Sequence, residues 1–286
     1  MAVAASLALC LAGCGKTTPR NGGKMVVVAS IAPLADFARQ VGRDRVQVEL
    51  LVPPGSNPHT YQVQPDQMKL LSNARVLVLN GAELEFWANN VIDAADNPRL
   101  LVVETADGLK LLGDEDHGGA GNPHVWLDPM DAIHQVEAIK DAFISADPDN
   151  ASDYAHYAHN YILRLKRLDA GIRSEVAGFR SRSFVSFHPT WVYFARRYGL
   201  TEAATIEHSP GKEPSPEDIK HAVDTARRLR ARAIFTERQM SPKAAEVVAE
   251  EVGARVIFLD AFGKPPRYDY IQTMRGNLRK MAEALK

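Results

Sequence analysis

One helical pattern is far longer than any other in this chain. From about Ala151 to Ala177, apolar residues recur in steps of three and four, which places them on one face of a helix. A helix of that span is roughly 40 Å long, at 1.5 Å per residue. That length is enough to run alongside two lobes, so we expect this helix to connect them. The apolar positions are Tyr154, Tyr157, Tyr161, Leu165, Leu168, Ile172 and Val176.

Short β-branched runs alternate with helical segments on both sides of this pattern. Such alternation is typical of an α/β fold, so we predict two lobes, each with a mainly parallel sheet flanked by helices, joined by one long rigid connector helix. The expected strands cover residues 24–29, 45–52, 75–79, 100–103, 184–187, 202–207, 232–235 and 255–259. The expected units are a leader and tether (1–24), an N-terminal lobe (25–146), the connector (147–179) and a C-terminal lobe (180–286).

The first residues differ from the body of the chain. Residues 1–13 are almost wholly apolar and small, and Leu11-Ala12-Gly13-Cys14 resembles a bacterial lipobox, in which the cysteine thiol takes a lipid. We therefore expect a protein of the periplasm or of the outer face of the cytoplasmic membrane, anchored through Cys14. Both cysteines, Cys10 and Cys14, lie in this leader. Any metal in the body must then be held by histidine and carboxylate.

The charge balance argues against nucleic acid as a partner. The chain has 34 Lys+Arg against 35 Asp+Glu, and no basic run stands out. Its 286 residues suffice for one large domain or two medium ones. The body contains no run of about 20 apolar residues that could span a membrane.

Four side chains occupy positions where an α/β protein places its ligands, beyond the carboxyl ends of the strands. His59 follows a predicted strand and its proline-rich turn, while His188 and Asp260 each follow a strand directly. His124 lies in the stretch NPHVWLDP, just before a helix start at Asp128-Pro129. Two of the four lie on each side of the connector, which predicts an ion in the cleft between the lobes. Imidazole and carboxylate together form a zinc-type ligand set.

Several other groups stay open as minor candidates. Glu237 ends a predicted strand and could be a fifth ligand, a partner of a ligand, or a structural acid. His117 lies in an acidic loop, and His208 lies beside a Pro-Gly turn at a possible cleft rim. Asp128 reads as a helix cap rather than a ligand.

The motifs together resemble the solute-binding proteins of bacterial zinc and manganese ABC importers. The resemblance rests on SNPHTY (56–61), VLNGAELEFW (78–87), NPHVWLDP (122–129), Phe187-His188 before an aromatic helix, EPSP (213–216) and Thr236-Glu237. It implies two α/β lobes joined by a rigid helix, with metal ligands at His59, His124, His188 and Asp260. A third histidine at position 188 is similar to the zinc-type members, so Zn²⁺ is the expected cargo and Mn²⁺ the second choice.

We therefore expect a monomeric, extracytoplasmic binding protein, without enzymatic activity, that delivers its metal ion to a membrane permease. Three other functions remain open from the sequence, and one of them is a surface adhesin role. A zinc-dependent hydrolase would use the three histidines as ligands and Glu237 or Asp260 as general base. A binding protein for a chelated metal or haem would need a wide pocket instead of a closed set of histidines.

Overall fold

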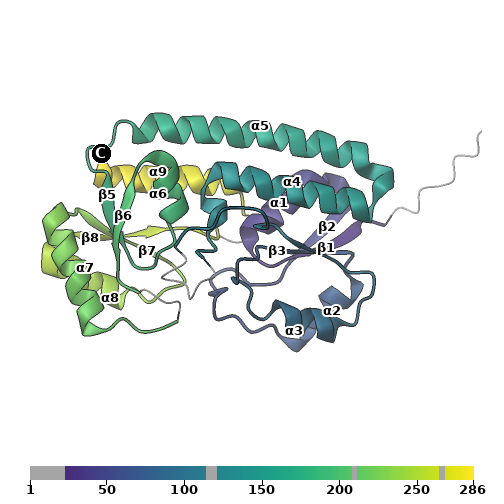
Figure 1. The fold of residues 1–286 in the computed structure, drawn as a ribbon, viewed down its shortest axis with the longest axis horizontal. Coiled ribbons are helices and arrows are strands. Elements are labelled where there is room, and N and C mark those ends of the chain that lie inside the picture. Colours follow the sequence, from purple (N-terminus) through teal and green to yellow (C-terminus); the bar gives the residue numbers. More distant parts are fainter. Residues whose placement is uncertain (1–22, 114–120, 208–210, 264–267) are drawn as a thin grey trace, which may run out of the picture.

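The N-terminal half of the molecule is built around one four-stranded sheet (Figure 1). The computed structural model describes residues 23–113, 121–207, 211–263 and 268–286. The leader with Cys14, as well as His117 and His208, lies outside the described residues. The elements of this half are β1 (Met25–Ala29), α1 (Ala32–Gly42), β2 (Val46–Leu50), α2 (Pro65–Asn73), β3 (Val76–Leu79), α3 (Ala88–Ala95), β4 (Leu101–Glu104) and α4 (Pro129–Ala146).

A 26-residue helix, α5 (Ala151–Val176), then runs along both halves and leads into the second one (Figure 1). The predicted long helix is thus present, and its apolar stripe is largely buried. The C-terminal half contains β5 (Ser183–Ser186), α6 (Val192–Tyr198), β6 (Thr201–Thr205), α7 (Pro216–Leu229), β7 (Ala233–Glu237), α8 (Lys243–Val252), β8 (Arg255–Leu259) and α9 (Tyr270–Leu285).

The two sheets have the same topology. Their strand orders are β2-β1-β3-β4 and β6-β5-β7-β8, and every strand pair is parallel. The fold class predicted from the sequence is confirmed. Because parallel strands need a crossover between them, helices cover both faces of each sheet.

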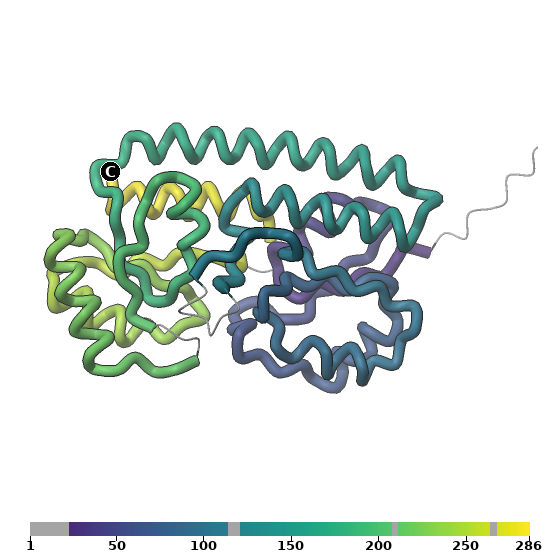
Figure 2. Tube along the Cα trace, in the orientation of Figure 1, coloured from purple at the N-terminus to yellow at the C-terminus, as the bar shows by residue number. Residues whose placement is uncertain are grey.

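One apolar core extends through both halves instead of stopping at a lobe boundary. It joins side chains of β1, α1 and α4 with side chains of α5, α6 and α9. Two smaller cores lie on the opposite sheet faces, under α2 and α3 in one half and under α7 and α8 in the other. Figure 2 shows that α9 (yellow) begins near the boundary between the halves and runs beneath α5 across the C-terminal half, where the chain ends. The two lobes are therefore held together by α5 and also by a shared interior.

A buried carboxylate ties three helices together inside this shared core. Asp36 of α1 accepts hydrogen bonds from the Tyr270 backbone N–H at the start of α9 (3.0 Å) and from the Tyr161 hydroxyl of α5 (3.3 Å). Burial raises the pKa of Asp36. Because a buried carboxylate needs partners, this cluster fixes where α9 begins relative to the N-terminal sheet.

Some helix starts differ from those predicted. The helix expected from His188 begins only at Val192, because residues 188–191 form a turn. Helix α3 was not predicted at all. The sequence Ser241-Pro242 favours Ser241 as N-cap of α8, but the N-cap is Pro242, and it has no side-chain cap. No described helix is long and apolar enough to cross a membrane.

Candidate metal centre

Three histidine side chains meet where the two halves of the molecule face each other. The ring centroids of His59, His124 and His188 lie 5.1, 5.2 and 5.0 Å apart, pair by pair. One ring nitrogen from each lies within 4.8 Å of the other two. The Nε2 atoms of His59 and His124 are 3.2 Å apart. Within the described ranges, this is the one group of three or more His, Cys, Asp or Glu residues that is compact enough to hold a metal ion.

Each histidine reaches this point from a loop that follows a strand or precedes a helix. His59 lies in the loop between β2 and α2, and its backbone N–H donates to Asn57 Oδ1 (3.0 Å). His188 directly follows the turn out of β5. His124 precedes a short 3-10 turn (Val125–Leu127), after which Asp128 caps α4 by accepting from the Met130 N–H (2.8 Å). The expected cap role of Asp128 is confirmed.

The second ring nitrogen of two of these histidines has a polar neighbour. His124 Nδ1 lies 2.8 Å from Asn122 Oδ1, and His188 Nδ1 lies 2.7 Å from Thr190 Oγ1. All four side chains are almost wholly buried, with about 1% of each exposed. Since Nδ1 is engaged in both rings, the Nε2 atoms are the ones directed to the centre of the group, which is the arrangement seen in metal sites.

Asp260, the fourth expected site residue, follows β8 but is not part of the three-histidine group. Its Oδ1 accepts hydrogen bonds from the backbone N–H groups of Phe262 (3.2 Å) and Gly263. The next residues contact the wall of the site: the Trp126 indole N–H donates to the Ala261 carbonyl (2.9 Å), and the Trp126 ring packs against Phe262. Trp126 in turn packs against His124, with ring centroids 5.2 Å apart. Asp260 thus lies on a segment that borders the site.

Glu237 is a buried acidic residue whose role the sequence leaves open. Glu237 at the end of β7 is fully buried, and its Oε1 accepts from the Trp191 indole N–H (2.9 Å). Burial raises the pKa of Glu237 to about 7, although the Trp191 and Thr190 hydrogen bonds oppose this shift. Burial and the nearby Glu237 charge raise the pKa of Glu202 to about 8. Glu237 is outside the three-histidine group, and its contact with the segment that carries His188 is through the Trp191 indole.

Other expected candidates lie elsewhere in the fold. Four histidines sit within helices, as predicted: His134 in α4, His156 and His159 in α5, and His221 in α7. Tyr61 packs against Trp87, and its hydroxyl donates to Gln67 (2.7 Å).

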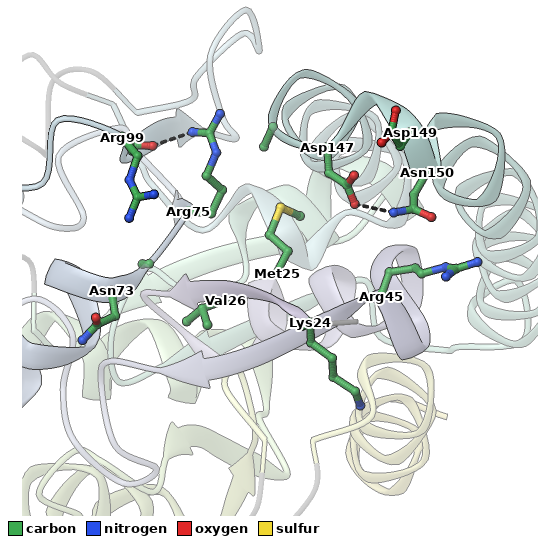
Figure 3. A pocket seen from close by; sticks show the side chains of 13 residues that line it. Lys24, Met25, Val26, Arg45, Asn73, Arg75, Arg99, Asp147, Asp149 and Asn150 are labelled. Carbon is green, nitrogen blue, oxygen red and sulfur yellow. Dashed lines mark hydrogen bonds between the residues drawn. The ribbon is translucent and has the colours of Figure 1, made fainter. Parts of the chain in front are cut away.

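A separate cavity of about 600 Å³ lies at the amino ends of the N-terminal sheet (Figure 3). It is lined by Lys24, Arg45, Arg75 and Arg99 together with Asp147 and Asp149, and by no histidine. Since the three-histidine group follows the carboxyl ends of β2 and β5, this cavity is at the opposite edge of the sheet.

The fold and the site together define a two-lobed α/β binding protein with a cluster of three histidines between its lobes, two of them buried. Residues 27–284 match the family model described as zinc-uptake complex component A, periplasmic, and the chain belongs to this family. The sequence-based resemblance is thereby confirmed.

Three known proteins illustrate the relationship. The zinc-binding lipoprotein AdcA of Streptococcus pneumoniae (strain TIGR4) is 28% identical over 98% of this chain, which spans 60% of that relative's length. A crystal structure of ZnuA superposes with a TM-score of 0.85 at 33% identity, covering 92% of this chain and 99% of that one. A manganese-bound periplasmic metal-binding protein from Candidatus Liberibacter asiaticus reaches a TM-score of 0.79 at 26% identity, covering 91% and 99%.

The buried Glu237 predicts a pH dependence of stability. A carboxyl group whose pKa is raised from 4.5 to about 7 by folding binds its proton more tightly in the folded state. Its contribution is therefore fully present below pH 4.5 and is lost as the pH rises through about 7. For this shift the contribution is on the order of 3 kcal/mol.

We expect the free energy of unfolding of the metal-free protein to fall less steeply between pH 4.5 and 7 in Glu237→Gln than in the wild type. The glutamine retains an acceptor for the Trp191 indole N–H. Urea denaturation at a series of pH values measures this difference. If the free energy of unfolding changes equally steeply with pH in the two proteins, the raised pKa of Glu237 is contradicted.

Proposed function

We propose that this protein captures a divalent transition-metal ion with His59, His124 and His188 and delivers it to the permease of an ABC importer. The observation that carries the proposal is the 3.2 Å separation of the His59 and His124 Nε2 atoms. Two nitrogens bound tetrahedrally to one zinc ion at 2.0–2.1 Å lie about 3.3–3.4 Å apart. The rings are thus already spaced as ligands of one ion.

The donor chemistry favours zinc over manganese. Three imidazole nitrogens suit zinc, whereas manganese prefers carboxylate, carbonyl and water oxygens. The relatives described above are a zinc-binding lipoprotein and a manganese-bound protein, so the family accommodates both ions. We propose Zn²⁺ as the cargo here, with Mn²⁺ as the weaker alternative.

The geometry weighs against two of the other functions that the sequence left open. A haem or other planar chelate does not fit between the ring nitrogens of His59 and His124, which are 3.2 Å apart, or beside His124 and His188, of which only about 1% is exposed. Glu237, as a hydrolase base, would have to act from a wholly buried position against the Trp191 indole, and both Glu237 and Asp260 lie outside the three-histidine group. We propose binding and release without a catalytic step, by a monomer with an N-terminal lobe (25–146), a connector helix (147–179) and a C-terminal lobe (180–286).

The ligand assignment predicts a large loss of zinc affinity in His124→Ala and His188→Ala. Loss of a residue that supports a metal ligand typically weakens metal affinity roughly 10–100-fold. Loss of the ligand itself should weaken it more. His221→Ala is the matched control, because this histidine is exposed on α7. Competitive titration with zinc and manganese measures both affinity and preference. Unchanged zinc binding in both ligand variants, or a wild-type preference for manganese, would contradict the proposal.

Asp260 is our proposed fourth ligand, through a carboxylate that turns towards the ion. Asp260→Asn separates this role from a structural one, because the amide oxygen can still accept from the Phe262 and Gly263 N–H groups but is uncharged. We expect Asp260→Asn to bind zinc more weakly, with an unchanged melting temperature in the metal-free protein. If affinity is retained in Asp260→Asn and lost in Asp260→Ala, Asp260 only shapes the loop.

We further propose that a lipid on Cys14 anchors the protein outside the cytoplasmic membrane. The support is the Leu11-Ala12-Gly13-Cys14 sequence and the lipoprotein nature of AdcA, to which the chain is similar. Cys14→Ser should move the protein from the membrane fraction to the soluble fraction of the producing cells. Equal membrane association of the two proteins would rule out this anchor.

A further inference from the structure

A single side chain, Asn122, links the metal-binding histidine of one half to the corresponding segment of the other half. Its Oδ1 accepts from the His124 backbone N–H (3.0 Å) and lies 2.8 Å from His124 Nδ1. Its Nδ2 donates to the carbonyl of Pro189 (2.5 Å), the residue after His188. Its own carbonyl accepts from the Tyr193 hydroxyl (2.6 Å). Only 1% of Asn122 is exposed, so these bonds form away from water.

The two ends of the Asn122 amide meet partners that fix its orientation. The Pro189 carbonyl can only accept a hydrogen bond, so the NH₂ end of the amide faces it. The oxygen end therefore faces His124, and because an amide oxygen can only accept, Nδ1 of His124 must carry the proton. The neutral ring then presents its Nε2 lone pair to the centre of the three-histidine group.

The same contacts join the two halves beside the site. Pro189 lies between His188 and Thr190, and Thr190 Oγ1 contacts His188 Nδ1 at 2.7 Å. Tyr193 of α6 also accepts from the Leu112 backbone N–H (3.0 Å), so its hydroxyl joins Leu112 and Asn122 to the C-terminal half. A shift of one half relative to the other would break the bonds of Asn122.

We propose that Asn122 is a positioning residue: it holds His124 in the Nδ1-protonated tautomer and fixes this ring against the His188 segment across the lobe boundary. This rests on the proposed function, in which both histidines bind the metal. Since the two rings are oriented before an ion arrives, binding does not have to order them. Loss of such a supporting partner typically weakens metal binding 10–100-fold.

Two substitutions of Asn122 separate its contribution from general loss of structure. Asn122→Ala removes both the acceptor for His124 and the donor to Pro189. Asn122→Asp retains an acceptor for His124 and replaces only the donor. Asn97→Ala is the matched control, because Asn97 likewise donates to two backbone carbonyls, those of Leu71 and Ala74, on the far side of the N-terminal lobe.

The tautomer of His124 is read by ¹⁵N NMR of the ring nitrogens in the metal-free protein, and zinc affinity by competitive titration. We expect Asn122→Ala to show a mixture of tautomers and zinc binding weakened 10–100-fold. Asn122→Asp should restore the protonated Nδ1 of His124 but recover only part of the affinity, because the bond to Pro189 is still missing. Asn97→Ala should match the wild type in both measurements. If Asn122→Ala does not fold, the tautomer of Asn122→Asp decides: a mixture there overturns the proposal.

Retention of the wild-type tautomer and affinity in folded Asn122→Ala would also overturn it. A failure of this proposal can be distinguished from a failure of the proposed function. If His124 is not a zinc ligand, His124→Ala binds zinc normally, while the tautomer measured without metal still reports whether Asn122 positions the ring.

Discussion

The distance between the two sheets is the constraint on which the site depends. The three histidines come from separate loops in both halves, yet one ring nitrogen from each lies within 4.8 Å of the others. Metal–nitrogen bonds tolerate deviations of only about 0.2 Å, so a small change in lobe separation would pull the group apart. The long helix α5 and the apolar core shared by α1, α5 and α9 hold that separation. We infer that rigidity between the lobes, more than any single ligand, makes the site possible.

Buried acids reinforce the two sheets at equivalent places. Glu85 follows β3 and accepts from the Ser30 hydroxyl (2.5 Å) and from the Asn80 and Gly81 N–H groups (2.9 and 3.0 Å). Glu237 ends β7, which occupies the same position in the second sheet, and burial raises the pKa of both acids to about 7. Because these carboxyls are enclosed, their partners fix the loops that leave the carboxyl edges of the sheets. Those edges carry the histidines.

The sequence was sufficient for features set by local chemistry. The strand–helix alternation predicted both parallel sheets, and Ser215-Pro216 predicted the start of α7, where Ser215 and Asp218 form a capping box. Local sequence patterns did not predict the contacts of a side chain whose partner is distant in sequence. The position of Asp131, three residues after the cap Asp128, favours a capping box at α4, but Asp131 pairs with Arg196 of α6 (2.8 Å). Helix α3 has no side-chain cap at its start, which left it without a sequence signal.

The site was predictable in part for the same reason. Strand-end positions pointed to His59 and His188, since parallel strands end at a common edge. They could not reveal that the Asp260 carboxylate turns to the backbone of its own loop. Nor could they reveal Asn122, whose partners Pro189 and Tyr193 are 67 and 71 residues away. An asparagine before a proline reads as an ordinary loop residue until the fold brings the halves together.

The most direct measurement of the central claim is zinc X-ray absorption spectroscopy of the loaded protein. Each coordinated imidazole adds a characteristic outer-shell scattering pattern to a first shell of nitrogen or oxygen at about 2.0–2.1 Å. Our account predicts the signature of three imidazoles and no sulfur in the wild type, and of two in His124→Ala loaded at high zinc. A wild-type spectrum with one imidazole or none would contradict it.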